Sequence, residues 1–128
     1  MRQLTAANGH SNSAFNSARF SQCGETFCFI KVDGSKGLTP EGFADKAEIE
    51  DSLERALRRE SFGAVIGGGT GRRYSYVDLA LVDVPRAIPV VRAALQSGKI
   101  PKRTWLQFFD SELAREWVGI WADSPEPP

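Results

Sequence analysis

Hydrophobic and polar residues recur along the chain with two different periods, which predict strands and helices in alternation. Two segments, about 45–60 and 83–98, carry apolar residues at helical spacings of three and four, with charged residues between them. Four other runs are rich in β-branched and aromatic residues, as is typical of strands. These runs are 26–32, 62–66, 72–82 and 104–109. The predicted order of elements is therefore βαββαβ.

This order predicts an α+β fold of two layers. Each helical segment has one apolar stripe, formed in the first by Ile49, Leu53 and Leu57. Both stripes can be buried on one face of a four-stranded antiparallel sheet if the crossovers are right-handed. This is the ferredoxin-like arrangement. Residues 112–121 fit either a short helix or a fifth, C-terminal edge strand.

One domain, residues 23–122, accounts for the predicted elements. Residues 1–22 are rich in Asn, Ser, Ala and Gly without a sustained period, so we expect a flexible tail, and 123–128 form a second tail. No apolar run approaches the roughly 20 residues that span a bilayer. The N-terminus lacks the apolar region of a signal peptide, so we expect a cytoplasmic protein. With 16 basic and 16 acidic residues, charge recognition must be local.

Three predicted loops meet at one end of the sheet and make it basic. The run Gly67–Gly71 is expected to form the hairpin turn, because glycine adopts positive φ angles readily, and its amides could form an anion-binding nest. Loops are also where lysine and arginine are commonly solvated, so the cluster has a plain alternative explanation. The candidate ligand-binding residues are Lys36, Gly67, Gly68, Gly69, Gly71, Arg72, Arg73, Lys99, Lys102 and Arg103.

Strand alternation predicts an aromatic face opposite the helices. In the third strand Val77, Leu79 and Leu81 point towards the helices, so their neighbours point away. An aromatic patch of this size is expected to be covered by residues 117–121, by a second copy or by a stacked ligand. We favour a homodimer or an intramolecular cover. The aromatic residues expected on this face are Phe27, Phe29, Tyr74, Tyr76, Trp105 and Phe109.

Most catalytic constellations are missing from the sequence. The single histidine, His10, lies in the predicted tail, which argues against a nucleophilic triad. Cys23 and Cys28, expected to be reduced, cannot build a zinc site without further ligands, so neither metal nor cofactor is expected. The glycine run lacks the lysine of a phosphate-binding loop. Asp78, for which Lys31 is a candidate partner, or Glu112 could serve a small enzyme, but the sequence favours a binding module.

Residues 72–79, Arg-Arg-Tyr-Ser-Tyr-Val-Asp-Leu, resemble the RNP1 octamer of the RNA-recognition motif family and lie on the third strand of the same element order. The resemblance implies single-stranded RNA binding, with bases stacked on Tyr74 and Tyr76. Arg73 stands where the octamer has glycine, and Leu79 where it ends in an aromatic residue.

Two functional hypotheses follow. The first is a non-enzymatic binding or regulatory module, dimeric, that holds an acidic protein partner or a small anionic ligand at its basic, glycine-rich end. The alternative is RNA binding on the aromatic face.

Overall fold

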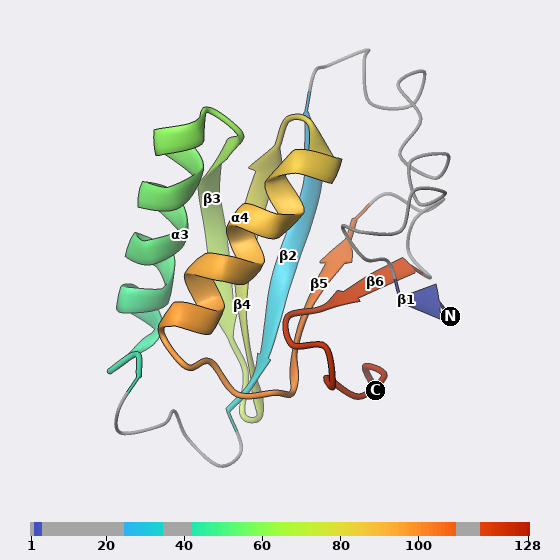
Figure 1. The fold of residues 1–128 in the computed structure, drawn as a ribbon. Coiled ribbons are helices and arrows are strands. Elements are labelled where there is room, and N and C mark those ends of the chain that lie inside the picture. The colour runs from blue at the N-terminus through green and yellow to red at the C-terminus, as the bar shows by residue number, and fades with distance from the viewer. Residues whose placement is uncertain (1, 4–24, 35–41, 110–115) are drawn as a thin grey trace.

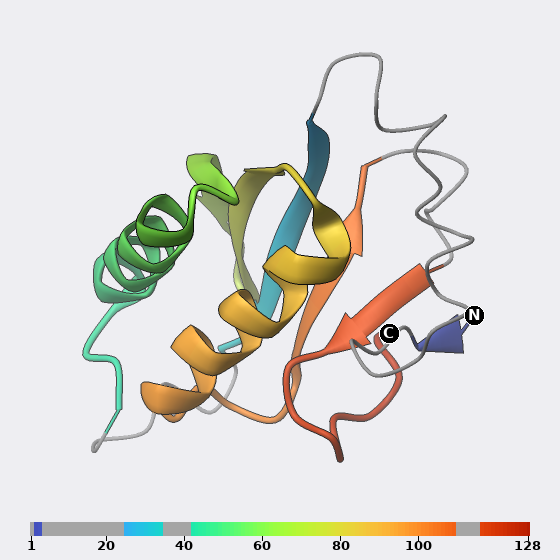
Figure 2. The same cartoon turned by 45° about the horizontal axis from the view of Figure 1, so that its top comes forward.

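The computed structural model describes residues 2–3, 25–34, 42–109 and 116–128. Two helices lie side by side on one face of a sheet, as Figures 1 and 2 show from two directions. The helices are α3 (Lys46–Glu60) and α4 (Val84–Ser97). The strands are β1 (Arg2–Gln3), β2 (Thr26–Asp33), β3 (Gly63–Thr70), β4 (Tyr74–Leu81), β5 (Thr104–Phe108) and β6 (Glu116–Gly119).

The strands form a single sheet in the order β1-β6-β5-β2-β4-β3. Neighbouring strands are antiparallel except β1, which pairs with β6 in parallel. The prediction of an α+β fold with helices on an antiparallel sheet is confirmed. The ambiguous segment after residue 111 contains a strand, β6, which pairs with β5 and extends the sheet. It therefore does not fold back over the sheet, as one of the expected covers required.

Local capping sets the start of α3 close to the predicted one. The Asp45 carboxylate accepts a hydrogen bond from the amide of Glu48 at 3.0 Å, and the Glu48 carboxylate accepts one from the amide of Ala44 at 3.1 Å. The first bond satisfies the Glu48 amide, which the first turn leaves without a partner, and the second satisfies the amide of Ala44, just before the capping residue. At the start of α4, Asp83 occupies the capping position, but its side chain makes no capping hydrogen bond and instead pairs with Arg86 at 3.5 Å.

The core lies between the helices and the sheet. Val77, Leu79 and Leu81 of β4 are buried there, as their alternation predicted. Cys28 of β2 is also fully buried, and burial, followed by the nearby charge of Asp78, raises the pKa of its thiol. Cys23 lies outside the described residues.

Most of the glycine run does not form the hairpin turn, so the prediction is wrong for Gly67, Gly68 and Gly69. Gly67, Gly68 and Gly69 belong to β3 and pair with residues of β4, so ladder pairing rather than a turn defines their conformation. The turn lies further on, where the amide of Gly71 donates to the carbonyl of Tyr74 at 2.8 Å. Among the described glycines only Gly63 has a positive φ, and a Cβ there would lie 2.2 Å from the Ala80 carbonyl oxygen.

Candidate functional site

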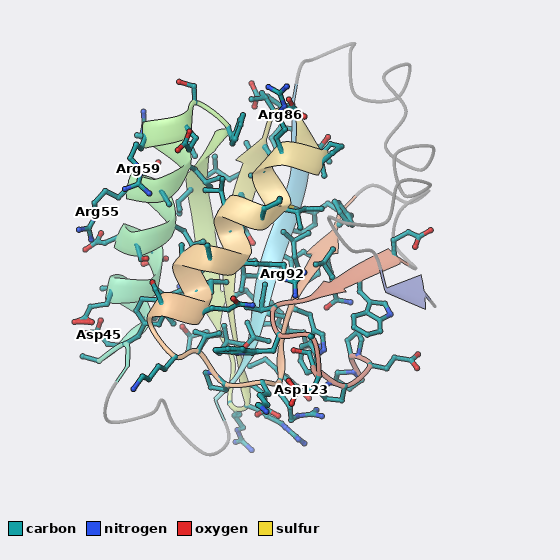
Figure 3. All side chains as sticks on the ribbon, viewed as in Figure 1. Asp45, Arg55, Arg59, Arg86, Arg92 and Asp123 are labelled. Carbon is teal, nitrogen blue, oxygen red and sulfur yellow. The ribbon has the colours of Figure 1, made fainter. Side chains whose placement is uncertain are left out.

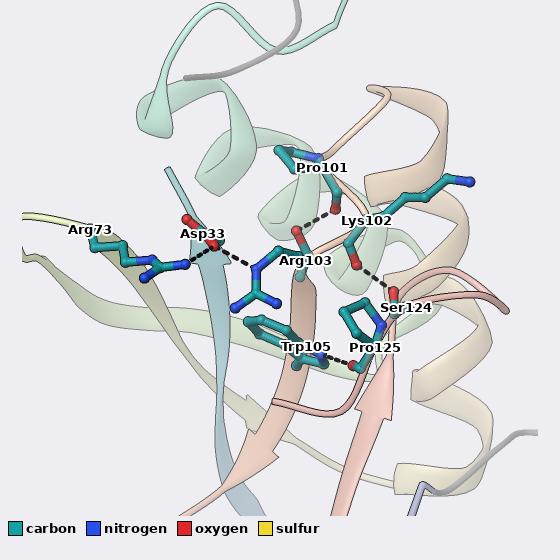
Figure 4. Close-up of polar contacts among 9 residues, drawn as sticks. Asp33, Arg73, Pro101, Lys102, Arg103, Trp105, Ser124 and Pro125 are labelled. Atoms are coloured by element: carbon teal, nitrogen blue, oxygen red, sulfur yellow. Dashed lines mark hydrogen bonds and ion pairs between the residues drawn. The ribbon is translucent and has the colours of Figure 1, made fainter. Parts of the chain in front are cut away.

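Asp33, the last residue of β2, binds arginines from two of the loops predicted to form the basic end. Its carboxylate is 3% exposed and accepts hydrogen bonds from Nε of Arg103 at 2.6 Å and from Nη2 of Arg73 at 3.3 Å (Figure 4). Backbone bonds from Asp33 to Arg103 and from Gly34 to Arg73 reinforce the contact. Asp33, and to a lesser degree Tyr74, raise the pKa of Arg103. The β3–β4 hairpin and the α4–β5 connection meet as predicted, whereas residues 35–41 of the third loop lie outside the described residues. Both guanidinium groups are bound to this carboxylate.

Another cation predicted at the basic end is also paired with a carboxylate. Lys102 pairs with Asp123, which lowers the pKa of that carboxyl. Figure 3 labels Asp123 in the C-terminal segment. Arg72 and Lys99 are exposed, and Lys36 lies outside the described residues. Because the amides of Gly67 to Gly69 lie in a strand, the expected anion-binding nest does not form there.

The face of the sheet that is turned away from the helices, here called the open face, is organised in rows across the strands. Pairing in register places residues of five strands next to one another along each row. We name each row after its residue in β2. The Phe29 row contains Gly67, Asp78, Phe29, Gln107 and Trp117. The Lys31 row contains Gly69, Tyr76, Lys31, Trp105 and Gly119.

A depression of about 310 Å³, the aromatic hollow, lies on the open face. The ring centroid of Phe29 lies 4.9 Å from that of Phe109 and 6.0 Å from that of Tyr76. A Cβ added to Gly69 would meet nothing within 4 Å, so the β3 side of the hollow stays open. Its volume and lining suit a planar ring of a ligand. The residues that line it are Phe29, Gly68, Gly69, Tyr76, Asp78 and Phe109.

Three cations border one end of the open face. Nζ of Lys31 lies 4.3 Å from the ring centroid of Tyr74, and Cζ of Arg73 lies 5.4 Å from the same centroid. Cζ of Arg103 lies 5.1 Å from the ring of Trp105. Tyr74 is therefore already in contact with two cations, whereas the hollow beside it is bounded by other aromatic rings.

Asp78 brings a carboxylate to the aromatic hollow. It makes no hydrogen bond or ion pair with any residue that the structure describes. Lys31, the partner considered for it from the sequence, lies over Tyr74 instead. On β5, Oε1 of Gln107 is buried and makes no hydrogen bond within the described part of the chain, but Gln107 does not line the hollow. The hollow thus combines aromatic walls with one carboxylate, that of Asp78.

The C-terminal residues cover one part of the open face. Nε1 of Trp105 donates to the carbonyl of Pro125 at 2.6 Å, and the Ser124 hydroxyl donates to the carbonyl of Lys102 at 2.6 Å (Figure 4). Trp105 is consequently fully buried, whereas Phe27 and Phe109 remain 46% and 56% exposed. The segment predicted as a C-terminal tail is in contact with the sheet.

Sequence reasoning missed Trp117 as a member of the open face. It is 6% exposed, and its Nε1 makes no hydrogen bond with the described residues. Its position follows from the pairing of Gln107 with Trp117, which no periodicity within either segment reveals.

Compared with protein-family models, with curated proteins and with solved structures, the chain shows no significant match. Neither described helix is long and apolar enough to cross a membrane. Within the described ranges, no three His, Cys, Asp or Glu side chains gather closely enough to hold a metal ion.

Proposed function

We propose that this protein is a non-enzymatic binding module that takes single-stranded RNA across its open face. The observation that carries the proposal is the aromatic hollow at Phe29, Tyr76 and Phe109 beside the cations Lys31 and Arg73. Proteins that bind single strands combine aromatic stacking platforms with positive charge along the phosphate path. The hollow would take a base, and the cationic end would take the neighbouring phosphates.

The geometry supports this site better than an anion site at the basic end alone. Arg73 and Arg103 are bound to the carboxylate of Asp33, and Lys102 is paired with Asp123. An anion at that end would compete with these carboxylates. Two guanidinium groups around one carboxylate still leave net positive charge, which suits a contributory phosphate contact.

The strand order supports a second, finer proposal about the fold. Strands β5-β2-β4-β3 lie next to one another in that order, with α3 joining β2 to β3 and α4 joining β4 to β5. We propose that these elements form a ferredoxin-like unit that is extended by β6 and β1. In such a unit the open face is the surface left uncovered by the helices.

Stacking is tested with a labelled octanucleotide of mixed RNA sequence and fluorescence anisotropy at low salt. Phe29→Ala should weaken binding roughly ten-fold, because base–aromatic stacking contributes about 1–3 kcal/mol. Phe27→Ala is the matched control, since Phe27 lies on the same strand and face but does not line the hollow. If the wild-type protein shows no binding at low salt, the proposal is wrong.

The phosphate contribution is tested separately by salt dependence. For single strands, each phosphate contact adds about −0.7 to the slope of log affinity against log salt concentration. Lys31→Ala should therefore make the slope less negative by nearly the value of one contact, about 0.7. Arg55→Ala on α3 removes an equal charge on the far side of the molecule and should leave the slope unchanged (Figure 3). Equal effects of both variants would indicate nonspecific attraction only.

A second copy of the chain is the competing occupant of the open face. Sedimentation velocity across the concentrations used for RNA binding distinguishes a second copy from RNA as the occupant. The variant Phe109→Glu, which places a charge on the exposed rim of the open face, is measured alongside the wild type. If the wild-type protein is dimeric, binds no RNA and becomes monomeric in the variant, the face is a dimer interface. A monomer that binds RNA and loses binding in Phe109→Glu supports the proposal.

A further inference from the structure

We infer that Asp78 makes the aromatic hollow selective for guanine over the other bases. The inference rests on the proposed RNA-binding function and names the base that the site prefers. It begins from the Phe29 row, in which Asp78 of β4 and Gln107 of β5 are the direct cross-strand neighbours of Phe29 on either side. Of these two neighbours only Asp78 lines the hollow, so a base stacked on Phe29 has a carboxylate on one flank.

The carboxylate of Asp78 lines the hollow and has no donor among the described residues. The carboxylate of Asp78 makes no hydrogen bond or ion pair with the residues described in the structure, and an ionised carboxylate only accepts hydrogen bonds. Gln107 does not line the hollow and its Oε1 is buried, so the amide adds no acceptor for a bound base. A ligand that supplies donors to the carboxylate of Asp78 gains charge-assisted hydrogen bonds.

Guanine matches a carboxylate better than the other RNA bases. Its Watson–Crick edge carries two adjacent donors, N1–H and the N2 amino group, which can bind both carboxylate oxygens at once, as a guanidinium does. Adenine and cytosine offer an amino group beside a ring acceptor. Uracil offers one N3–H between two carbonyl oxygens, which a carboxylate repels. The carboxylate of Asp78 should therefore bind guanine more tightly than adenine, cytosine or uracil.

Charge also orients the strand in the hollow. A carboxylate at Asp78 disfavours a phosphate next to it, whereas Lys31 lies in the adjacent row, on the side of the cationic end. The base rather than the backbone should therefore enter the hollow, and the phosphates should follow Lys31 and Arg73. Asp78 thus acts as a specificity residue that contacts the ligand, distinct from the stacking residues.

The test uses labelled heptamers that differ only at the centre: UUUGUUU, the same strand with A, C or U, and one with inosine, which lacks the N2 amino group. Wild-type protein should bind the guanine strand roughly ten-fold more tightly than the uracil strand, within the range of a bidentate contact. The inosine strand should fall between them. In Asp78→Asn the guanine-to-uracil ratio should approach one.

Asp51→Asn on the exposed side of α3 is the matched control, because it removes the same charge away from the open face. It should retain the wild-type ratio. Equal binding of all five strands, or an unchanged preference in Asp78→Asn, would overturn the inference and leave RNA binding intact. Absence of binding to every strand would instead contradict the proposed function. Circular dichroism of each variant confirms that the fold is kept.

Discussion

The carboxylate of Asp33 lies 2.6 Å from Nε of Arg103, although the two residues are 70 positions apart in the chain. The same oxygen accepts from Arg73, so one buried carboxylate ties the β3–β4 hairpin and the α4–β5 connection to the end of β2. Because Arg103 also lies over Trp105, and Arg73 over Tyr74, this contact orients the cationic border of the open face.

Replacing Asp33 with Asn should destabilise the fold by about 1–3 kcal/mol. The neutral amide is a weaker hydrogen-bond acceptor for Arg73 and Arg103 than the buried carboxylate. Urea unfolding followed by circular dichroism measures the change. Asp123→Asn is the control, because it also removes an ion pair, the one with Lys102. Both side chains of that pair are more than half exposed. The unfolding midpoint of this variant should stay close to that of the wild type. A larger effect at Asp123 than at Asp33 would contradict the role given to burial.

Gly69→Val should separate stability from binding. A Cβ at Gly69 has open space around it, and β-branched residues favour strands, so the free energy of unfolding should rise by about 0.5–1 kcal/mol. The new side chain would project over the aromatic hollow next to Tyr76 and should weaken RNA binding. Gly68→Ala should instead destabilise the protein, because its Cβ would lie 2.5 Å from the Tyr76 carbonyl oxygen. Thermal unfolding and anisotropy measure the two effects.

Removing residues 123–128 should expose Trp105. The deletion removes the Pro125 carbonyl that accepts from Nε1 of Trp105, a bond that contributes about 1 kcal/mol, and it uncovers the indole. We expect tryptophan emission to shift to longer wavelength and the urea midpoint to fall. Trp105→Phe in the full chain provides the control, since the same deletion in that background should produce a much smaller spectral shift. An unshifted spectrum after deletion would contradict the cover.

Cys28 should be unreactive in the folded protein. Its side chain is fully buried and the pKa of its thiol is raised, mainly by burial, so the thiolate that reacts with disulfide reagents is not available at neutral pH. In a Cys23→Ser variant, labelling should occur only after unfolding. A folded-state pKa above the unfolded one also means that stability falls as the pH rises beyond about 8.5, where the unfolded chain can form the thiolate. Rapid labelling of the native variant at pH 7 would refute this.

Much of the fold follows from local patterns. The start of α3 is set by Asp45 and Glu48, which lie within one turn of each other, and strand alternation correctly assigns Val77 and Leu79 to the core. The sequence places the hairpin turn too early because glycine permits both a turn and a strand, and pairing with β4 decides between them at Gly67, Gly68 and Gly69.

The sequence by itself determined the order of the elements from β2 to β5 and the face on which most of their side chains lie, since both depend on steric preferences and periods among near neighbours. Only the tertiary structure decided that Phe29 lies between Asp78 and Gln107, that Asp33 joins Arg73 to Arg103, and that Pro125 covers Trp105. Those contacts depend on strand register and on interactions between residues far apart in the chain, where many alternative pairings share the same local pattern.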